Sequence, residues 1–362
     1  MAILDVVFEG GGAKGVALSG AVGAILARGH RLGRLVGTSA GAITATNLAI
    51  GYRPEEILVS SKLRTPDGQP IYSSFNDAPS LSPEELRSTG LYHALARLPL
   101  PMPAAWEANV DMALLRGLLA VPGVASMVSL VELGGMHRGE AFLVWMQGCL
   151  SARNTSWGAA TFAQLYEATR VDLSVVTTDT TARRMLVLNH RTAPDVPVAW
   201  GVRMSMSIPF YWDEVVWRAE WGTYLGQRID GHVLVDGGVV SNFPLQIVAD
   251  PDDTEVITWM GAVPADARNP VLGLFLDADL AVAGQPPPPS NTHISCRISA
   301  LLDTLMSARD NGVFDANQDR IVRLPVGGYG TTEFAMSDSR MDALYNAGFQ
   351  AAEAWCTAHP NG

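Results

Sequence analysis

The chain has 362 residues, of which 48% are hydrophobic, and a formal net charge of −11. It is long and apolar enough to bury a sizeable core in one large domain or in two, which excludes an intrinsically disordered protein. The acidic balance argues against nucleic acid as the main ligand and against electrostatic attraction to anionic membranes, so any contact with lipid is expected to be mainly apolar. Three widely spaced cysteines predict neither a disulfide framework nor a zinc site.

The apolar N-terminus, Ile3–Phe8, is expected to be a buried β-strand. It lacks the basic region of a signal peptide, and it contains Asp5. The longest apolar region, residues 110–136, is interrupted by charged residues and a proline too often for a membrane span. We therefore expect a soluble, cytoplasmic protein, and the sequence contains no signal for an oligomeric state.

A glycine-rich loop runs from Gly10 to Gly15, between the first strand and a helix expected over residues 16–28. Such a loop directs backbone N–H groups toward a ligand, which is either a phosphate or the oxyanion of an acyl-transfer intermediate. A P-loop is excluded, because its second glycine must be followed by Lys-Ser or Lys-Thr and Gly15 is followed by Val16.

A dinucleotide-binding fingerprint is formally matched by the glycines of the same loop. That fingerprint also requires an acidic residue about 20 positions further on to bind the ribose. No Asp or Glu occurs between Gly10 and Pro54. A variant that binds NADP through Arg31 or Arg34 stays open, and an NADP-dependent oxidoreductase is therefore one alternative function.

The next motif joins a short apolar run to a helix expected over residues 40–51. Gly37-Thr-Ser39-Ala-Gly41 at this junction is typical of a nucleophile elbow, in which a serine occupies a strained turn between strand and helix. Ser39 is therefore the candidate nucleophile. Consecutive parallel strands place the loops that follow them at one edge of the sheet, which favours the oxyanion interpretation of the glycine loop.

Residues 60–160 have little strand character and contain clustered prolines. Helical pieces are expected near 82–98, 111–120 and 140–152. We interpret this region as a helical insertion or cap within a single domain of residues 1–362. Its apolar side chains, with Trp106 and Trp145, can line an acyl pocket or touch a membrane interface, but ordinary core packing is the favoured explanation for them.

Strand patterns return in the second half of the chain and include His232 to Asp236, where an apolar run ends in Asp236-Gly237-Gly238. The further strands are expected at 171–178, 185–189, 214–217, 271–276 and 320–324, and the further helices at 198–207, 294–310 and 338–359.

The glycine loop, the elbow and the Asp-Gly-Gly segment together resemble the motifs of the patatin-like phospholipase family. In this sequence they stand as Gly-Gly-Gly-Ala-Lys-Gly at 10–15, Gly-Thr-Ser-Ala-Gly at 37–41 and Asp-Gly-Gly at 236–238. The resemblance covers roughly residues 3–51 and 171–357. It implies an α/β protein with a three-layer αβα fold, a mainly parallel central sheet and the helical insertion between the two matching parts.

The resemblance implies a catalytic dyad of Ser39 and Asp236 in place of a triad. His232 is about 13 Å along the same strand from Asp236 and cannot pair with it side by side. His293 is the one tolerable alternative base. Burial is expected to raise the pKa of Asp236 and so make it a better base.

The other site residues follow from the same motifs. The oxyanion hole is expected from the backbone of Gly10, Gly11, Gly12 and Ala13. Supporting motif positions are Lys14, Gly15, Gly37, Gly41, Gly237 and Gly238. Lys14 either binds an anionic head group or fatty acid product, or braces the loop through an ion pair. No metal and no organic cofactor is expected.

The predicted function is that of a lipid acyl hydrolase, a phospholipase or lipase that cleaves carboxylic esters of phospholipids or acyl glycerols, possibly at a membrane surface. The same dyad in a differently shaped pocket makes a general esterase or an acyl thioesterase, which is the nearest alternative.

Overall fold

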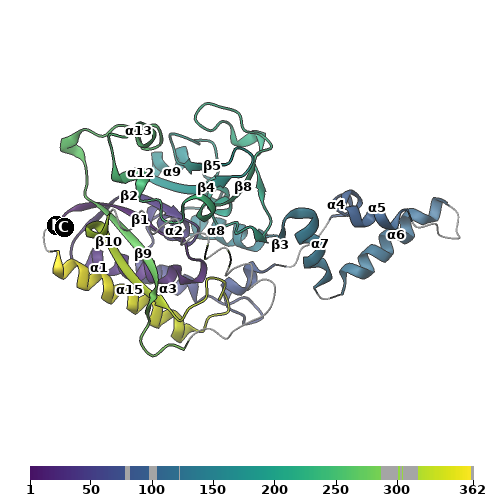
Figure 1. Cartoon of the computed structure of the whole chain (residues 1–362), viewed down its shortest axis with the longest axis horizontal. Coiled ribbons are helices and arrows are strands. Elements are labelled where there is room, and N and C mark those ends of the chain that lie inside the picture. The colour runs from purple at the N-terminus through teal and green to yellow at the C-terminus, as the bar shows by residue number, and fades with distance from the viewer. Residues whose placement is uncertain are drawn as a thin grey trace.

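The computed structural model describes residues 1–77, 82–97, 104–121, 123–286, 301, 304 and 317–359. It is a mixed α/β protein in which helices cover both faces of a central sheet, and one group of helices extends to the side (Figure 1). The path of the sheet runs through β10 (Ile321–Gly327), β9 (Val271–Ala281), β1 (Ile3–Phe8), β2 (Arg31–Thr38), β4 (Leu173–Asp179), β8 (Val233–Asp236) and β7 (Val215–Val216), with β5 (Arg184–Leu188) paired to β4 outside this path.

The strands at the centre of the sheet are parallel, as the sequence predicted. β10, β9, β1, β2 and β4 pair in parallel, whereas β5, β8 and β7 join in antiparallel pairs. The expected fold class is therefore confirmed.

Strands β2 and β8 meet end to end along one edge of β4. The last residue of β2, Thr38, pairs with Val176, and the last residue of β8, Asp236, pairs with the adjacent Thr177. Strand β5 lies on the other edge of β4, because Val176 also pairs with Val187. The residue after Thr38 is thus brought beside Asp236 by strands that approach from opposite directions.

The alternation of side chains along the strands separates the core into two layers. Val6 and Phe8 of β1 belong to one buried cluster and Val7 belongs to the other. Helices α1 (Val16–Ala27) and α15 (Asp338–Ala358) contribute to the first cluster. Helices α12 (Gln246–Ala249) and α13 (Thr254–Met260) contribute to the second. Helices on both faces of the sheet make the three-layer arrangement.

The region between residues 60 and 160 divides into a base and an arm. The base comprises the 3-10 turn η2 (Ile71–Phe75), the short strand β3 (Gly135–His137), which pairs with β6 (Phe210–Trp212), and helix α8 (Glu140–Arg153). The helical arm extends away from the sheet (Figure 1) and consists of α4 (Pro83–Ser88), α5 (Gly90–Leu95), α6 (Ala104–Leu119) and α7 (Val124–Leu133). The division into one domain with an insertion over 60–160 stays a prediction.

Among the described residues, no single helix is long and apolar enough to cross a membrane. The bent pair Val110–Leu119 and Val124–Glu132 meets the length and composition requirements only when the two halves are taken together.

Most strands and helices expected from the sequence are found with ends shifted by a few residues. The helical piece expected near 82–98 is instead two short helices, α4 and α5, and the one expected over 111–120 begins earlier, at Ala104. The helix expected over 294–310, with His293 and Cys296, lies outside the described residues apart from 301 and 304. The side chain of Trp106 is not described either. The sequence analysis missed β3 and β6, because a strand of three residues is too short to show alternation. It also did not predict helices α7, α12 and α13.

Candidate functional site

Ser39 occupies the sharp turn between β2 and α2 (Ala40–Ala49). Its φ of 51° and ψ of −118° are rare for a residue with a side chain, and only 5% of the residue is exposed. The turn is tight: a Cβ atom on Gly37 would lie 2.4 Å from the backbone of Gly41. The Ser39 N–H donates to Oγ of Ser205 over 2.8 Å. The backbone at Ser39 thus forms the sharp, strained turn between strand and helix that the sequence predicts.

Asp236 lies at the end of β8 and is 1% exposed. Its Oδ1 accepts a hydrogen bond of 2.7 Å from the N–H of Gly238. Its own N–H donates to the carbonyl of Ser207 over 2.8 Å. Its Oδ2 is buried and accepts no hydrogen bond from the described residues. One oxygen is therefore fixed and the other is available to a proton.

Burial raises the pKa of Asp236 to about 7, against smaller lowering effects of the Gly238 N–H and the Ser39 side chain. The registers of β2 and β8 on β4 bring Ser39 and Asp236 close together. Oδ2 nevertheless accepts no hydrogen bond from the described residues, so the two side chains are neighbours without a formed bond at that oxygen. Apo sites often show such loose contacts.

The glycine loop packs directly against Ser39, since a Cβ atom on Gly10 would lie 3.2 Å from Cβ of Ser39. Two of its amides are already engaged. Gly10 N–H donates to the carbonyl of Asn242 over 3.0 Å, and Ala13 N–H donates to that of Thr331 over 2.9 Å. The amides of Gly11 and Gly12 have no acceptor among the described residues. Gly11 and Gly12 therefore supply the unengaged backbone donors of this part of the loop.

Two further polar residues, Ser205 and Asn242, hold the elbow and the glycine loop in place. Ser205, at the end of α10 (Val198–Ser205), accepts the Ser39 N–H and donates to the carbonyl of Val176 over 2.6 Å. Asn242 donates through Nδ2 to Oε1 of Glu9 and to the carbonyl of Gly10, both over 3.1 Å. In the sequence, Ser205 lies two residues before Ser207-Ile-Pro, and Asn242 begins Asn-Phe-Pro; both segments resemble the family, but neither pattern indicates a hydrogen-bond partner.

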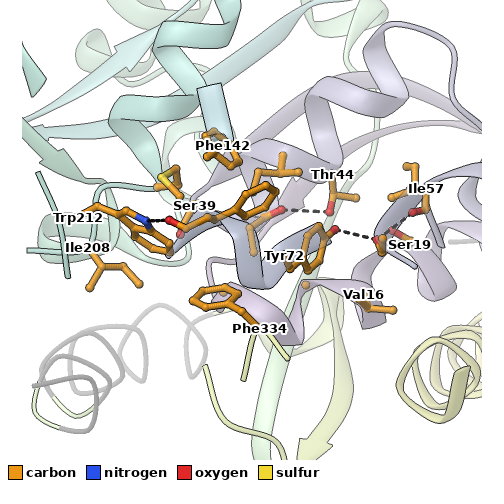
Figure 2. Close-up of a pocket in the computed structure, with 17 residues that line it drawn as sticks. Val16, Ser19, Ser39, Thr44, Ile57, Tyr72, Phe142, Ile208, Trp212 and Phe334 are labelled. Carbon is orange, nitrogen blue, oxygen red and sulfur yellow. Dashed lines mark hydrogen bonds between the residues drawn. The ribbon is translucent and has the colours of Figure 1, made fainter. Parts of the chain in front are cut away.

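Ser39 opens into an apolar pocket with about 600 Å³ of empty space, including the open solvent at its mouth (Figure 2). Phe142, Trp212 and Phe334 are among the residues that line it, and none of the lining side chains is charged. The base of residues 60–160 contributes to this wall. Trp145, for which pocket lining and core packing were both open, is not among the lining residues and packs against Phe75, with ring centroids 5.3 Å apart.

The model of the family described as "Patatin-like phospholipase" matches residues 6–249, about two thirds of the chain. The chain belongs to the patatin-like phospholipase family. The resemblance read from the motifs is thereby confirmed, and at the level of the family the protein is a lipid acyl hydrolase.

The similarity to other proteins covers nearly the whole of this chain. The uncharacterized protein YqhO of Bacillus subtilis is 28% identical over 358 residues, 97% of each chain. The crystal structure of VipD from Legionella pneumophila has a TM-score of 0.50 and 17% identity, over 99% of this chain and 67% of that one. The type III effector ExoU has a TM-score of 0.42 and 16% identity, and the present chain spans 54% of its length. The likeness to VipD supports the fold alone.

The remaining motif positions, among them Gly15 and Gly237, pack close to the same elbow. A Cβ atom on Gly15 would lie 2.7 Å from that of Ala40, and one on Gly237 would lie 2.4 Å from the carbonyl oxygen of Val176. Lys14 is half-buried and forms no ion pair with the described residues. The bracing ion pair is therefore not seen there, and head-group binding by Lys14 stays a prediction. His232 contacts Asp179, at 2.8 Å, away from Asp236.

No metal-binding cluster of three or more His, Cys, Asp or Glu side chains is found in the described parts of the chain. Cys149 and Cys356 are buried free thiols, and burial raises the pKa of both.

Proposed function

We propose that the protein hydrolyses carboxylic esters of lipids, either glycerophospholipids or neutral acyl glycerols, through a dyad of Ser39 and Asp236. The observation that carries the proposal is the end-to-end meeting of β2 and β8, which places a strained serine beside a buried carboxyl group. The raised pKa of about 7 supports a role for Asp236 as base near neutral pH.

In the proposed reaction, Asp236 accepts the proton of the Ser39 hydroxyl as Oγ attacks the ester carbonyl carbon. The negative charge on the carbonyl oxygen is met by the free N–H groups of Gly11 and Gly12. Protonated Asp236 then gives its proton to the departing alcohol, which leaves an acyl-enzyme on Ser39. A water molecule repeats the sequence, with Asp236 again as base, and releases the fatty acid.

Covalent labelling with a fluorophosphonate probe tests the nucleophile. We expect Ser39 to carry the label when the peptides are mapped, and Ser39→Ala to abolish labelling. A label on another serine, with full activity in the Ser39→Ala variant, would overturn the proposal.

The nearest alternative function is that of a general esterase or thioesterase, which differs in the acyl chain that its pocket accepts. The apolar pocket favours the lipid ester, because an acyl chain buries its surface against aromatic and aliphatic side chains. Rates for long and short acyl esters, measured above and below the aggregation threshold of the lipid, separate the two.

The NADP-dependent alternative predicts binding of NADPH at the glycine loop. Arg34, one of its two candidate ligands, already pairs with Asp172 over 3.4 Å. The hydrolase proposal predicts no change in nicotinamide fluorescence when the protein is titrated with NADPH.

A further inference from the structure

Hydroxyl groups gather at the end of the apolar pocket away from the candidate nucleophile. Figure 2 shows Ser39 toward one side of the pocket, and Ser19 and Tyr72 toward the other. Ser19 belongs to α1, Ser61 ends α3 (Pro54–Ser61), and Tyr72 lies in η2. Three separate elements thus bring polar atoms into a wall that is otherwise mostly apolar.

The protons of Ser61 and Tyr72 are accounted for by their own contacts. Ser61 Oγ donates to the carbonyl of Ile57 over 2.9 Å and lies 2.7 Å from the Tyr72 hydroxyl. Because Ser61 has a single proton, Tyr72 is the donor between the two. Burial raises the pKa of Tyr72 to about 12, so it keeps its proton. Its oxygen retains lone pairs that can accept a hydrogen bond.

Ser19 differs from the other hydroxyls of the pocket. It is 1% exposed, and its Oγ has no hydrogen-bond partner among the described residues. Thr44 lines the same pocket, but its Oγ1 donates to the carbonyl of Ala40 over 3.1 Å. Buried hydroxyl groups normally have partners, and a purely hydrocarbon chain supplies none. The vacant hydrogen-bonding capacity of Ser19 therefore points to a polar atom on the substrate.

We propose that this pocket selects acyl chains that carry a hydroxyl group remote from the ester carbonyl, with Ser19 as donor and Tyr72 as acceptor to that hydroxyl. A hydroxyl both accepts and donates, so it satisfies both side chains, whereas a ketone can only accept from Ser19. A terminal carboxylate is disfavoured, because none of the lining side chains carries a positive charge. The inference rests on the proposed function, since it requires an acyl chain to enter from Ser39.

Paired nitrophenyl esters test the proposal, each hydroxylated acyl chain being compared with the unsubstituted chain of equal length, from octanoate to hexadecanoate. We expect the wild type to have a kcat/KM about tenfold higher for the better-fitting hydroxylated ester. Ser19→Ala should bring that ratio close to one, by lowering the rate for the hydroxylated ester and raising it for the plain one. The substitution suits a helix, and a thermal melt checks that the fold is intact.

Thr44→Val is the matched control, because it removes a pocket hydroxyl that is already bonded within its own helix. Its ratio between the two esters should stay at the wild-type value. Equal rates for both esters in the wild type, with the same ratio in Ser19→Ala, would overturn the inference while leaving the hydrolase intact. Failure of every ester to turn over in a Ser39-dependent manner would instead remove the proposed function.

Discussion

The end of the sheet that carries Ser39 and Asp236 differs from the helical arm in its hydrogen bonding and in its burial. At the sheet end, the backbone N–H groups of both residues donate to buried partners, Ser205 and Ser207. The arm instead exposes large apolar side chains, including Met127 at 55% and Val131 at 76%. Backbone geometry is thus fixed at the end of the sheet where chemistry is proposed, whereas the arm leaves apolar side chains exposed.

The link between the two regions is a small polar cluster around Arg138, which follows β3. Arg138 pairs with Glu85 of α4 over 2.6 Å and with Asp213 of the body over 3.2 Å. Ser129 of α7 lies 3.4 Å from Asp213. Burial raises the pKa of Asp213 to about 6, although Arg138 acts against that rise. The arm is thus joined to the body partly through charge.

The largest expected effect is loss of the dyad. Ser39→Ala and Asp236→Ala should each lower kcat at least about a thousandfold, and the double variant should be no worse, because residues that act as one unit are not additive. Initial rates on a long-chain ester measure this. Modest losses that add in the double variant would show that the sheet end is not the catalytic region.

The second prediction concerns pH. Because Asp236 must be ionised to accept the proton and its pKa is raised to about 7, kcat/KM should rise about tenfold per pH unit below that value and level off above it. A pH profile of kcat/KM measures the midpoint. An activity that is flat down to the ordinary pKa of a carboxyl group would contradict the assigned base.

Ser205 supports the elbow without reaching substrate. Ser205→Ala removes the acceptor of the Ser39 N–H, and we expect kcat to fall roughly tenfold to a hundredfold with KM little changed. Ser205→Thr, which keeps the hydroxyl, should restore part of the rate. An unchanged kcat in Ser205→Ala, measured on the same ester, would show that the elbow needs no such support.

Asp236→Asn should separate activity from stability. The folded protein holds the proton of Asp236 up to a pKa of about 7, whereas an unfolded chain releases it near its ordinary value. Ionisation of Asp236 therefore lowers the free energy of unfolding of the wild type as pH rises from the ordinary pKa of an aspartate to about 7. Above pH 7 the loss of stability is complete. Asparagine cannot ionise, so the melting temperature of the inactive variant should gain a few degrees on the wild type between about pH 4 and pH 8.

The smallest effect is expected at the arm. Arg138→Ala should speed hydrogen exchange in α4 and α7 while changing hydrolysis of a soluble ester less than about twofold. Arg64→Ala is a matched control, because its ion pair with Asp338 is exposed and lies outside the arm. Exchange in the arm that is equal in both variants would show that charge does not hold it.

Much of the sheet was predictable because each strand carries its own local signal. β1 was expected over Ile3–Phe8 and is found there, since a run of buried apolar residues ends abruptly at glycines. The elbow at Ser39 could also be predicted, because Gly37 is required by its close contact with Gly41 in the same turn. Gly41 itself is required by the backbone of Phe8 on the neighbouring strand β1, a contact that only the fold creates. The short strands β3 and β6 could not be predicted, since they exist only through pairing with each other.

The sequence by itself determined the parts of the candidate site: a serine in a strained turn, a glycine loop and a carboxylate at a strand end. Only the tertiary structure decided how they meet, because β8 runs antiparallel to β4 and brings Asp236 to the end of β2. It also decided which loop amides are free, since Asn242 and Thr331 occupy those of Gly10 and Ala13. Local propensity depends on a few neighbouring residues. Hydrogen-bond partners at the site instead come from segments far apart in the sequence, 166 positions for Ser39 and Ser205 and 233 positions for Glu9 and Asn242.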